Sequence, residues 1–110
     1  MPIVADDVEL TMVTLRLDAI DEAAAAKLVG VLAKYVVVAR GHEGCRNIDL
    51  ANSVTSPERF LLVQKWDSPA TQHAHFDSAE MIEMAESCRG LLAHAPDVDL
   101  WDGMSAHDLA

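Results

Sequence analysis

The alternation of apolar and polar residues predicts a first strand over 9–17, "ELTMVTLRL". Its two faces are Val13, Leu15 and Leu17 on one side, and Leu10, Met12, Thr14 and Arg16 on the other. Side chains two apart share a face of a strand, so apolar residues stand on both faces. We therefore expect something to cover each face of the sheet that contains this strand.

Three further segments have strand character: 45–54, 59–66 and 97–103. Between the first two, Pro57 suits the first inner position of a turn, which predicts a hairpin. Residues 59–66 also divide into two faces, Phe60, Leu62, Gln64 and Trp66 on one and Leu61, Val63 and Lys65 on the other. Both of these faces are partly apolar as well.

Helical spacing marks the remaining segments. The alanine-rich stretch over 21–39 carries one apolar stripe: Ala24, Leu28, Val31, Leu32, Tyr35 and Ala39. Asp18 or Asp21 can cap this helix, and glycines follow its end. Pro69 suits the first turn of a short helix, and a third helix is expected over 78–94.

The order β-α-β-β-α-α-β is typical of an α+β, ferredoxin-like split βαβ fold with an antiparallel sheet. We expect a single domain over 1–110, with its core at about 9–103. Helices would cover one face of the sheet and leave the other bare. The bare face is expected to expose Leu10, Met12, Phe60, Leu62 and Trp66. A patch of that size predicts a homodimer closed over it.

Composition narrows the classes of partner. The chain has 110 residues, 51% of them hydrophobic, and a formal net charge of −10. Such a charge repels phosphate, so neither nucleic acid nor an anionic membrane is expected as a partner. There is no apolar run of membrane-spanning length and no signal peptide at the start, which predicts a cytoplasmic protein. Cys45 and Cys88 are expected to be free thiols.

Two histidines, His73 and His75, raise the question of a metal site. Positions two apart on a helix point roughly 200° apart, so one ring should face solvent and the other the interior. No metal is therefore expected at this pair. His42, His94 and His107 are expected to be solvated. No phosphate loop, catalytic serine arrangement or dinucleotide signature is present, so no flavin or nicotinamide cofactor is expected.

The face with Trp66 and Gln64 has two interpretations. It is either a wall of a ligand cavity or an ordinary core whose tryptophan N–H needs a partner. Trp101 could line the same cavity or cap a dimer contact. Arg16 could reach solvent or meet an anionic ligand.

Residues 44–78, "GCRNIDLANSVTSPERFLLVQKWDSPATQHAHFDS", resemble the antibiotic biosynthesis monooxygenase (ABM) family. The matching residues are Gly44-Cys45, Trp66-Asp67-Ser68, Ala70 and His75. With the element order, the resemblance covers about 9–103. It implies a dimeric α+β barrel in which two sheets pack face to face. It also implies oxygenation of quinols or polycyclic aromatics by O₂ without metal or flavin, although relatives degrade haem, isomerise or bind small molecules.

The resemblance places the catalytic roles on Trp66 and His75. Two positions depart from the aromatic polyketide oxygenases, since Leu62 stands in place of an asparagine and Gln72 in place of a tyrosine. The first strand also lacks the asparagine of the haem-degrading branch.

The expected function is thus a cofactor-independent monooxygenase that oxidises a small quinol, phenolic or polyketide-like aromatic with O₂. His75 would act as general base, and the Trp66 N–H would hold a substrate oxygen. The substrate-binding residues are expected to be Phe60, Leu62, Gln64 and Met12. The alternative is a non-oxidative isomerase or binding protein on the same fold.

Overall fold

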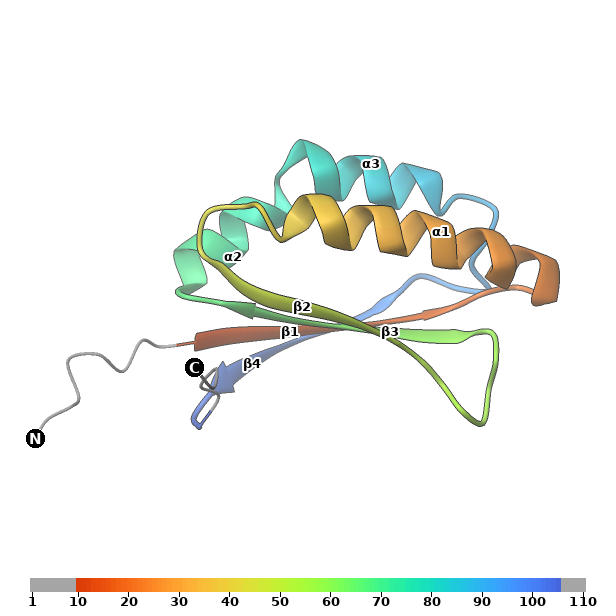
Figure 1. Cartoon of the computed structure of the whole chain (residues 1–110), viewed down its shortest axis with the longest axis horizontal. Coiled ribbons are helices and arrows are strands. Elements are labelled where there is room, and N and C mark those ends of the chain that lie inside the picture. The colour runs from red at the N-terminus through yellow and green to blue at the C-terminus, as the bar shows by residue number, and fades with distance from the viewer. Residues whose placement is uncertain (1–9, 106–110) are drawn as a thin grey trace, which may run out of the picture.

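Four strands and three helices follow one another in the computed structural model, which describes residues 10–105 (Figure 1). The elements are β1 (Leu10–Asp18), α1 (Glu22–Ala39), β2 (Cys45–Asn52), β3 (Arg59–Trp66), α2 (Pro69–Phe76), α3 (Ala79–Ser87) and β4 (Asp97–Gly103). The strands form one antiparallel sheet in the order β2-β3-β1-β4. All three helices cover one face of this sheet, and the other face is bare (Figure 1). The ferredoxin-like α+β prediction is confirmed.

The sequence offers Asp18 or Asp21 as the cap of helix α1, and the structure uses the second. Asp21 is the N-cap, and its carboxylate accepts a hydrogen bond from the backbone N–H of Ala24 at 2.7 Å. The β-branched residues 36–38 remain helical, since their neighbours Tyr35 and Ala39 are buried on the sheet. None of the helices within residues 10–105 is long and apolar enough to span a bilayer.

Helix α2 is positioned by the loop that precedes β2. Gly44 has φ of +82°, and a Cβ built on it would lie 2.4 Å from Cβ of Thr71. Only glycine accepts both that backbone conformation and that close approach. The Gly44 carbonyl also accepts the backbone N–H of Asp67 at 2.8 Å. The loop after α1 therefore lies against the start of α2.

The third helix is shorter than predicted. It ends at Ser87 rather than near residue 94, and Gly90 adopts φ of +79° in the turns that follow. Leu92 forms an isolated β-bridge with Ala19, and the Leu91 carbonyl accepts the backbone N–H of Ile20. These leucines keep a helical spacing in the sequence, but their backbone pairs with the end of β1. Strand β2 likewise ends at Asn52 rather than at residue 54.

The expected composition of the bare sheet face is wrong. The register pairs Val13 with Gln64, Leu15 with Leu62 and Leu17 with Phe60. Phe60, Leu62 and Trp66 therefore lie beneath the helices, fully or almost fully buried within one chain. Leu10 is buried too. Of the five residues expected on the bare face, Met12 is therefore the one that is not buried. Both faces of β3 are partly apolar, so periodicity could not tell them apart.

The bare face carries a different set of residues. The strand registers place Met12, Thr14, Arg16, Leu61, Val63, Lys65 and Trp101 on it. Trp101 is 53% exposed, and its indole N–H donates to the hydroxyl of Thr14 at 2.9 Å. Leu61 is also exposed. An apolar patch thus remains on this face, centred on different side chains from those expected.

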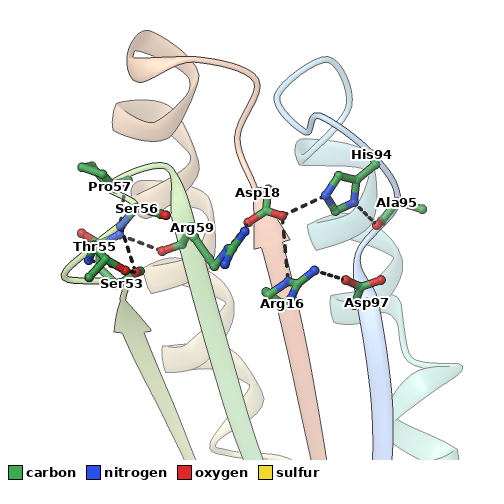
Figure 2. A network of polar contacts seen from close by, with 11 residues as sticks. Arg16, Asp18, Ser53, Thr55, Ser56, Pro57, Arg59, His94, Ala95 and Asp97 are labelled. Carbon is green, nitrogen blue, oxygen red and sulfur yellow. Dashed lines mark hydrogen bonds and ion pairs between the residues drawn. The ribbon is translucent and has the colours of Figure 1, made fainter.

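A polar network joins the end of β1 to the starts of β3 and β4 (Figure 2). The carboxylate of Asp18 accepts from Nε of Arg59 at 2.9 Å and lies 2.8 Å from Nε2 of His94. Partial burial acts to raise the pKa of Asp18, but the hydrogen bonds from Arg59 and His94 outweigh it and lower the pKa. Arg16 pairs with Asp97 at 2.6 Å instead of extending freely into solvent. His94 is half-exposed, as expected for a surface residue, yet it has a defined partner.

Candidate functional site

A cluster of buried polar side chains lies between the helices and the sheet. Its members come from three elements: Tyr35 from α1, Gln64 and Trp66 from β3, and His75 from α2. Each is at most 4% exposed. Polar groups buried to this degree are nearly always hydrogen-bonded, because an unpaired buried polar group costs free energy.

Hydrogen bonds join the four side chains into a chain. The Trp66 indole N–H donates to Oε1 of Gln64 at 2.9 Å, and Nε2 of Gln64 donates to the hydroxyl oxygen of Tyr35 at 2.7 Å. The same hydroxyl lies 2.6 Å from Nε2 of His75. Tyr35 and His75 are forty positions apart in the sequence, so only the fold brings them together.

This chain has a definite direction. An indole nitrogen can only donate, so the carbonyl oxygen of Gln64 must face Trp66 and its amide N–H₂ must face Tyr35. Tyr35 therefore accepts from Gln64, and its own hydrogen is free for Nε2 of His75 to accept. A neutral imidazole that accepts at Nε2 carries its hydrogen on Nδ1. This arrangement favours the Nδ1–H tautomer of His75, because the Tyr35 hydrogen would otherwise lose Nε2 as its acceptor.

His75 is uncharged near neutral pH. Burial, and secondarily the neighbouring His42, lower its pKa from the ordinary 6.5 to about 4, against an opposing effect of Glu80. Burial likewise raises the pKa of Tyr35, so its hydroxyl keeps its proton. The pair is a neutral donor and a neutral acceptor rather than an ion pair.

The other ring nitrogen of His75 has no partner. Nδ1 is buried and makes no hydrogen bond among residues 10–105. In the tautomer derived above this atom carries an N–H, which leaves a buried donor unsatisfied. Such a donor is suited to a carbonyl or phenolate oxygen of a ligand, because the neutral imidazole can stabilise negative charge there.

Two more rings surround His75. Trp66 stacks on it with centroids 4.6 Å apart, and His42 meets it edge-on at 4.8 Å. His42 is only partly exposed, since its Nε2 lies 2.7 Å from Oε2 of Glu80 in the first turn of α3. The expectation that His42 is simply solvated is therefore wrong. Nothing in the local sequence could show this, because His42 and Glu80 are 38 positions apart.

A cavity of about 310 Å³ opens between α1 and α3, beside this cluster. Its lining includes Gly30, Val31, Lys34, Tyr35, Glu80 and Met84. Tyr35 and Glu80 connect it to the interior, since the first bonds to His75 and the second to His42. Glu80 stays ionised, because its own backbone N–H and then His42 hydrogen-bond to its carboxylate and lower its pKa.

The structure brings together only some of the residues expected at the site. Trp66, His75 and Gln64 meet in the cluster, and Phe60 and Leu62 share the buried face of β3 with them. Met12 lies on the opposite face of the sheet, where it lines a shallow groove with Trp101. The Trp66 N–H is engaged by Gln64, in contrast to the substrate contact expected for it.

Tyr35, His42 and Glu80 are the residues that sequence reasoning missed. Tyr35 was recognised only as one apolar position in the stripe of α1. A tyrosine within such a stripe does signal a buried hydroxyl that needs a partner, but the sequence does not say which partner.

The two histidines of α2 diverge, as their spacing predicts. His73 is 81% exposed and lies 3.6 Å from Asp77, whereas His75 is buried. Within residues 10–105, no three histidine, cysteine or acidic side chains gather closely enough to hold a metal ion. Cys45 and Cys88 are both free thiols.

Residues 11–87 of the chain match the protein family described as "Antibiotic biosynthesis monooxygenase". This match covers most of the molecule and includes α1, the β2–β3 hairpin and the cluster around His75. The chain belongs to the antibiotic biosynthesis monooxygenase family. No curated protein matches the sequence.

Solved structures share the fold at low sequence identity. NE2512 of Nitrosomonas europaea, a protein of unknown function, is 18% identical with a TM-score of 0.82, over 94% of this chain and 97% of that one. A candidate antibiotic biosynthesis monooxygenase of Deinococcus radiodurans is 18% identical with a TM-score of 0.81, over 91% and 98%. Rv0793 of Mycobacterium tuberculosis is 21% identical with a TM-score of 0.77, over 92% and 98%. At these identities the likeness establishes the fold.

Proposed function

We propose that this protein is a cofactor-independent monooxygenase that oxidises a small, electron-rich phenol or quinol with O₂. The single observation that carries the proposal is the unpartnered, buried Nδ1 of His75 in a family whose name denotes monooxygenases. A hydrogen-bond donor held ready in a water-excluded site is a means of stabilising an anion.

The chemistry needs a substrate anion, because the anion transfers an electron to O₂ far more readily than the neutral phenol does. In our proposal, the substrate oxygen accepts a hydrogen bond from Nδ1–H of His75 as negative charge develops on it. The role of His75 is therefore electrostatic stabilisation rather than proton abstraction. Trp66 and Gln64 act through Tyr35 and hold the imidazole in the required tautomer.

The oxidation balances without a further reductant. The phenolic proton passes to water as the anion forms. One electron then passes from the anion to O₂, giving superoxide and a radical centred on a ring carbon that carries a hydrogen. These combine to a peroxide, which loses water and leaves a C=O group. One O₂ thus supplies one carbonyl oxygen and one water, and the substrate provides all the electrons. The apolar side chains of Phe60 and Leu62 help to keep bulk water from the intermediates.

Oxygen consumption with a panel of hydroquinones and anthrones tests the proposal. His75→Asn places an amide N–H₂ close to the position of Nδ1, whereas His75→Gln places one close to Nε2. If the Nδ1 donor acts on the substrate, we expect His75→Gln to lower kcat by about 10²–10³-fold and His75→Asn to retain more of the rate. His73→Ala is the matched control, since His73 is an exposed residue of the same helix. Equal rates in wild type and both His75 variants would refute the assigned role.

A non-oxidative isomerase or binding protein remains the second candidate. The observation that favours it is the apolar character of Leu62, which gives the site one polar group fewer than the polyketide oxygenases are expected to have. Saturable binding of a quinol under nitrogen, with no oxygen uptake in air, would support this candidate and exclude the first.

A further inference from the structure

His94 lies in the connection between α3 and β4, where both of its ring nitrogens face oxygen atoms (Figure 2). Nδ1 lies 2.8 Å from the carbonyl oxygen of Ala95, and Nε2 lies 2.8 Å from Oδ2 of Asp18. Both oxygens can only accept, since a carbonyl carries no hydrogen and the lowered pKa of Asp18 keeps its carboxylate ionised. A neutral imidazole has a single N–H, so only the imidazolium form of His94 satisfies both contacts. The geometry therefore describes a cation.

The groups around His94 form one charged network that joins three strands. Asp18 ends β1 and Asp97 starts β4. Nε of Arg59, the first residue of β3, lies 2.9 Å from Asp18, and Arg16 of β1 lies 2.6 Å from Asp97. Arginine keeps its charge at any working pH, and the carboxylates stay ionised above acid pH. His94 is thus the member of this network whose charge can change near neutral pH.

The surroundings of His94 raise its pKa above the ordinary 6.5. The hydrogen bond to the Ala95 carbonyl contributes most and the bond to Asp18 comes next, against an opposing effect of partial burial. When the folded-state pKa is the higher one, the stabilisation is complete below the unfolded pKa and is lost as the pH rises through the folded pKa. The contribution of His94 therefore declines from near neutral pH upwards.

We propose that His94 is a pH-sensitive clasp. As a cation it fixes the connection between α3 and β4 to the end of β1 and, through Asp18 and Arg59, to the start of β3. When it loses its proton to solvent, one of its two hydrogen bonds is lost and the connection loosens. The release is local, because the backbone N–H of Ala93 still donates to the carbonyl of Asp18 at 2.8 Å. It affects the residues that lead into β4, which lies at the edge of the sheet beside β1.

Nuclear magnetic resonance tests the charge state of His94. In wild type, we expect the titration midpoint of its ring to lie above 6.5. Asp18→Asn keeps the size of the side chain and removes its charge, so it should shift this midpoint back towards 6.5.

Amide hydrogen exchange at the start of β4, over 97–99, tests the clasp. The rate in wild type is divided by the rate in His94→Gln at the same pH, which cancels the pH dependence of exchange itself. We expect wild type to exchange about two- to fivefold more slowly at about pH 6, since an exposed ion pair stabilises only modestly, and at nearly the same rate at about pH 8.5.

Two further variants serve as controls for the exchange measurement. His94→Lys keeps a cation at both pH values, so its rate relative to His94→Gln should not change between them. His73→Gln replaces an 81% exposed histidine of α2 that pairs with Asp77, outside this network, and should leave exchange over 97–99 as in wild type.

Three outcomes overturn the proposal. The first is a titration midpoint of His94 at or below 6.5. The second is a ratio of wild type to His94→Gln that is the same at both pH values. The third is a pH-dependent ratio that persists in His94→Lys, which would place the titrating group elsewhere. None of these measurements involves oxygen or a ligand, so their result is independent of the proposed function.

Discussion

The hydroxyl oxygen of Tyr35 lies 2.6 Å from Nε2 of His75, although the two residues belong to helices α1 and α2 and are forty positions apart. With Nε2 as the acceptor in this contact, the hydrogen of neutral His75 is on Nδ1. Tyr35 also bonds to Gln64, which in turn bonds to Trp66, and Tyr35 lines the cavity beside α3.

Removing the shared hydroxyl should destabilise the fold. Tyr35→Phe leaves the amide of Gln64 and Nε2 of His75 without their partner, so we expect a loss of about 1–3 kcal/mol in the free energy of unfolding. Urea denaturation followed by circular dichroism measures the change. ¹⁵N NMR of His75 should show Nδ1 protonated in wild type and a mixture of tautomers in the variant.

A double variant provides the control for Tyr35→Phe. Gln64→Leu removes the amide that Tyr35→Phe leaves without a partner. Tyr35→Phe should therefore lower the free energy of unfolding less in the presence of Gln64→Leu than alone. Strictly additive losses would show that Tyr35 and Gln64 are not energetically coupled.

Burial of His75 should make stability depend on pH. The pKa of His75 is about 4 in the folded protein and 6.5 ordinarily, so between these values the unfolded chain binds a proton that the folded chain does not. The contribution of His75 to stability is therefore constant above about pH 6.5 and declines as the pH falls towards 4. By pH 5 the loss should amount to about 2 kcal/mol.

Carboxylates also titrate at low pH and change the stability. The contribution of His75 is therefore the difference between wild type and a variant without the imidazole. Urea midpoints of wild type and His75→Asn at pH 7.5 and pH 5 isolate it, because the other groups are common to both. If the two proteins lose the same stability between these pH values, the pKa of His75 is not depressed.

The bare sheet face should mediate assembly. We predict a two-fold symmetric dimer closed over the face that carries Leu61 and Trp101. Leu61→Asp should give a folded monomer in sedimentation velocity at micromolar concentration. Val37→Asp is the control, because Val37 is 72% exposed on the helical side. A wild-type monomer under these conditions would contradict the prediction.

Gly44 should tolerate no side chain. Gly44→Ala combines an unfavourable φ of +82° with a contact of 2.4 Å to Thr71, whereas Gly90→Ala combines a similar φ of +79° with open space. We expect Gly90→Ala to cost about 1–2 kcal/mol and Gly44→Ala clearly more. The difference between their urea midpoints measures the steric part. Equal losses would mean that α2 can move away from Gly44.

The sequence by itself determined the features that depend on local periodicity and capping. The element order, a cap for α1 at Asp18 or Asp21, and the divergence of His73 and His75 all follow from residue spacing and side-chain chemistry within a few positions. The motif around Trp66 and His75 also pointed to the family that the comparison established.

Only the tertiary structure decided which face of β3 the helices cover, where α3 ends, and that Tyr35 and Glu80 join the histidines. Each of these depends on pairing register or on contacts between residues far apart along the chain. Both faces of β3 are apolar enough to be buried, so the register with β1 makes the choice. Leu91 and Leu92 could have extended a helix, but their backbone bonds to the end of β1 instead.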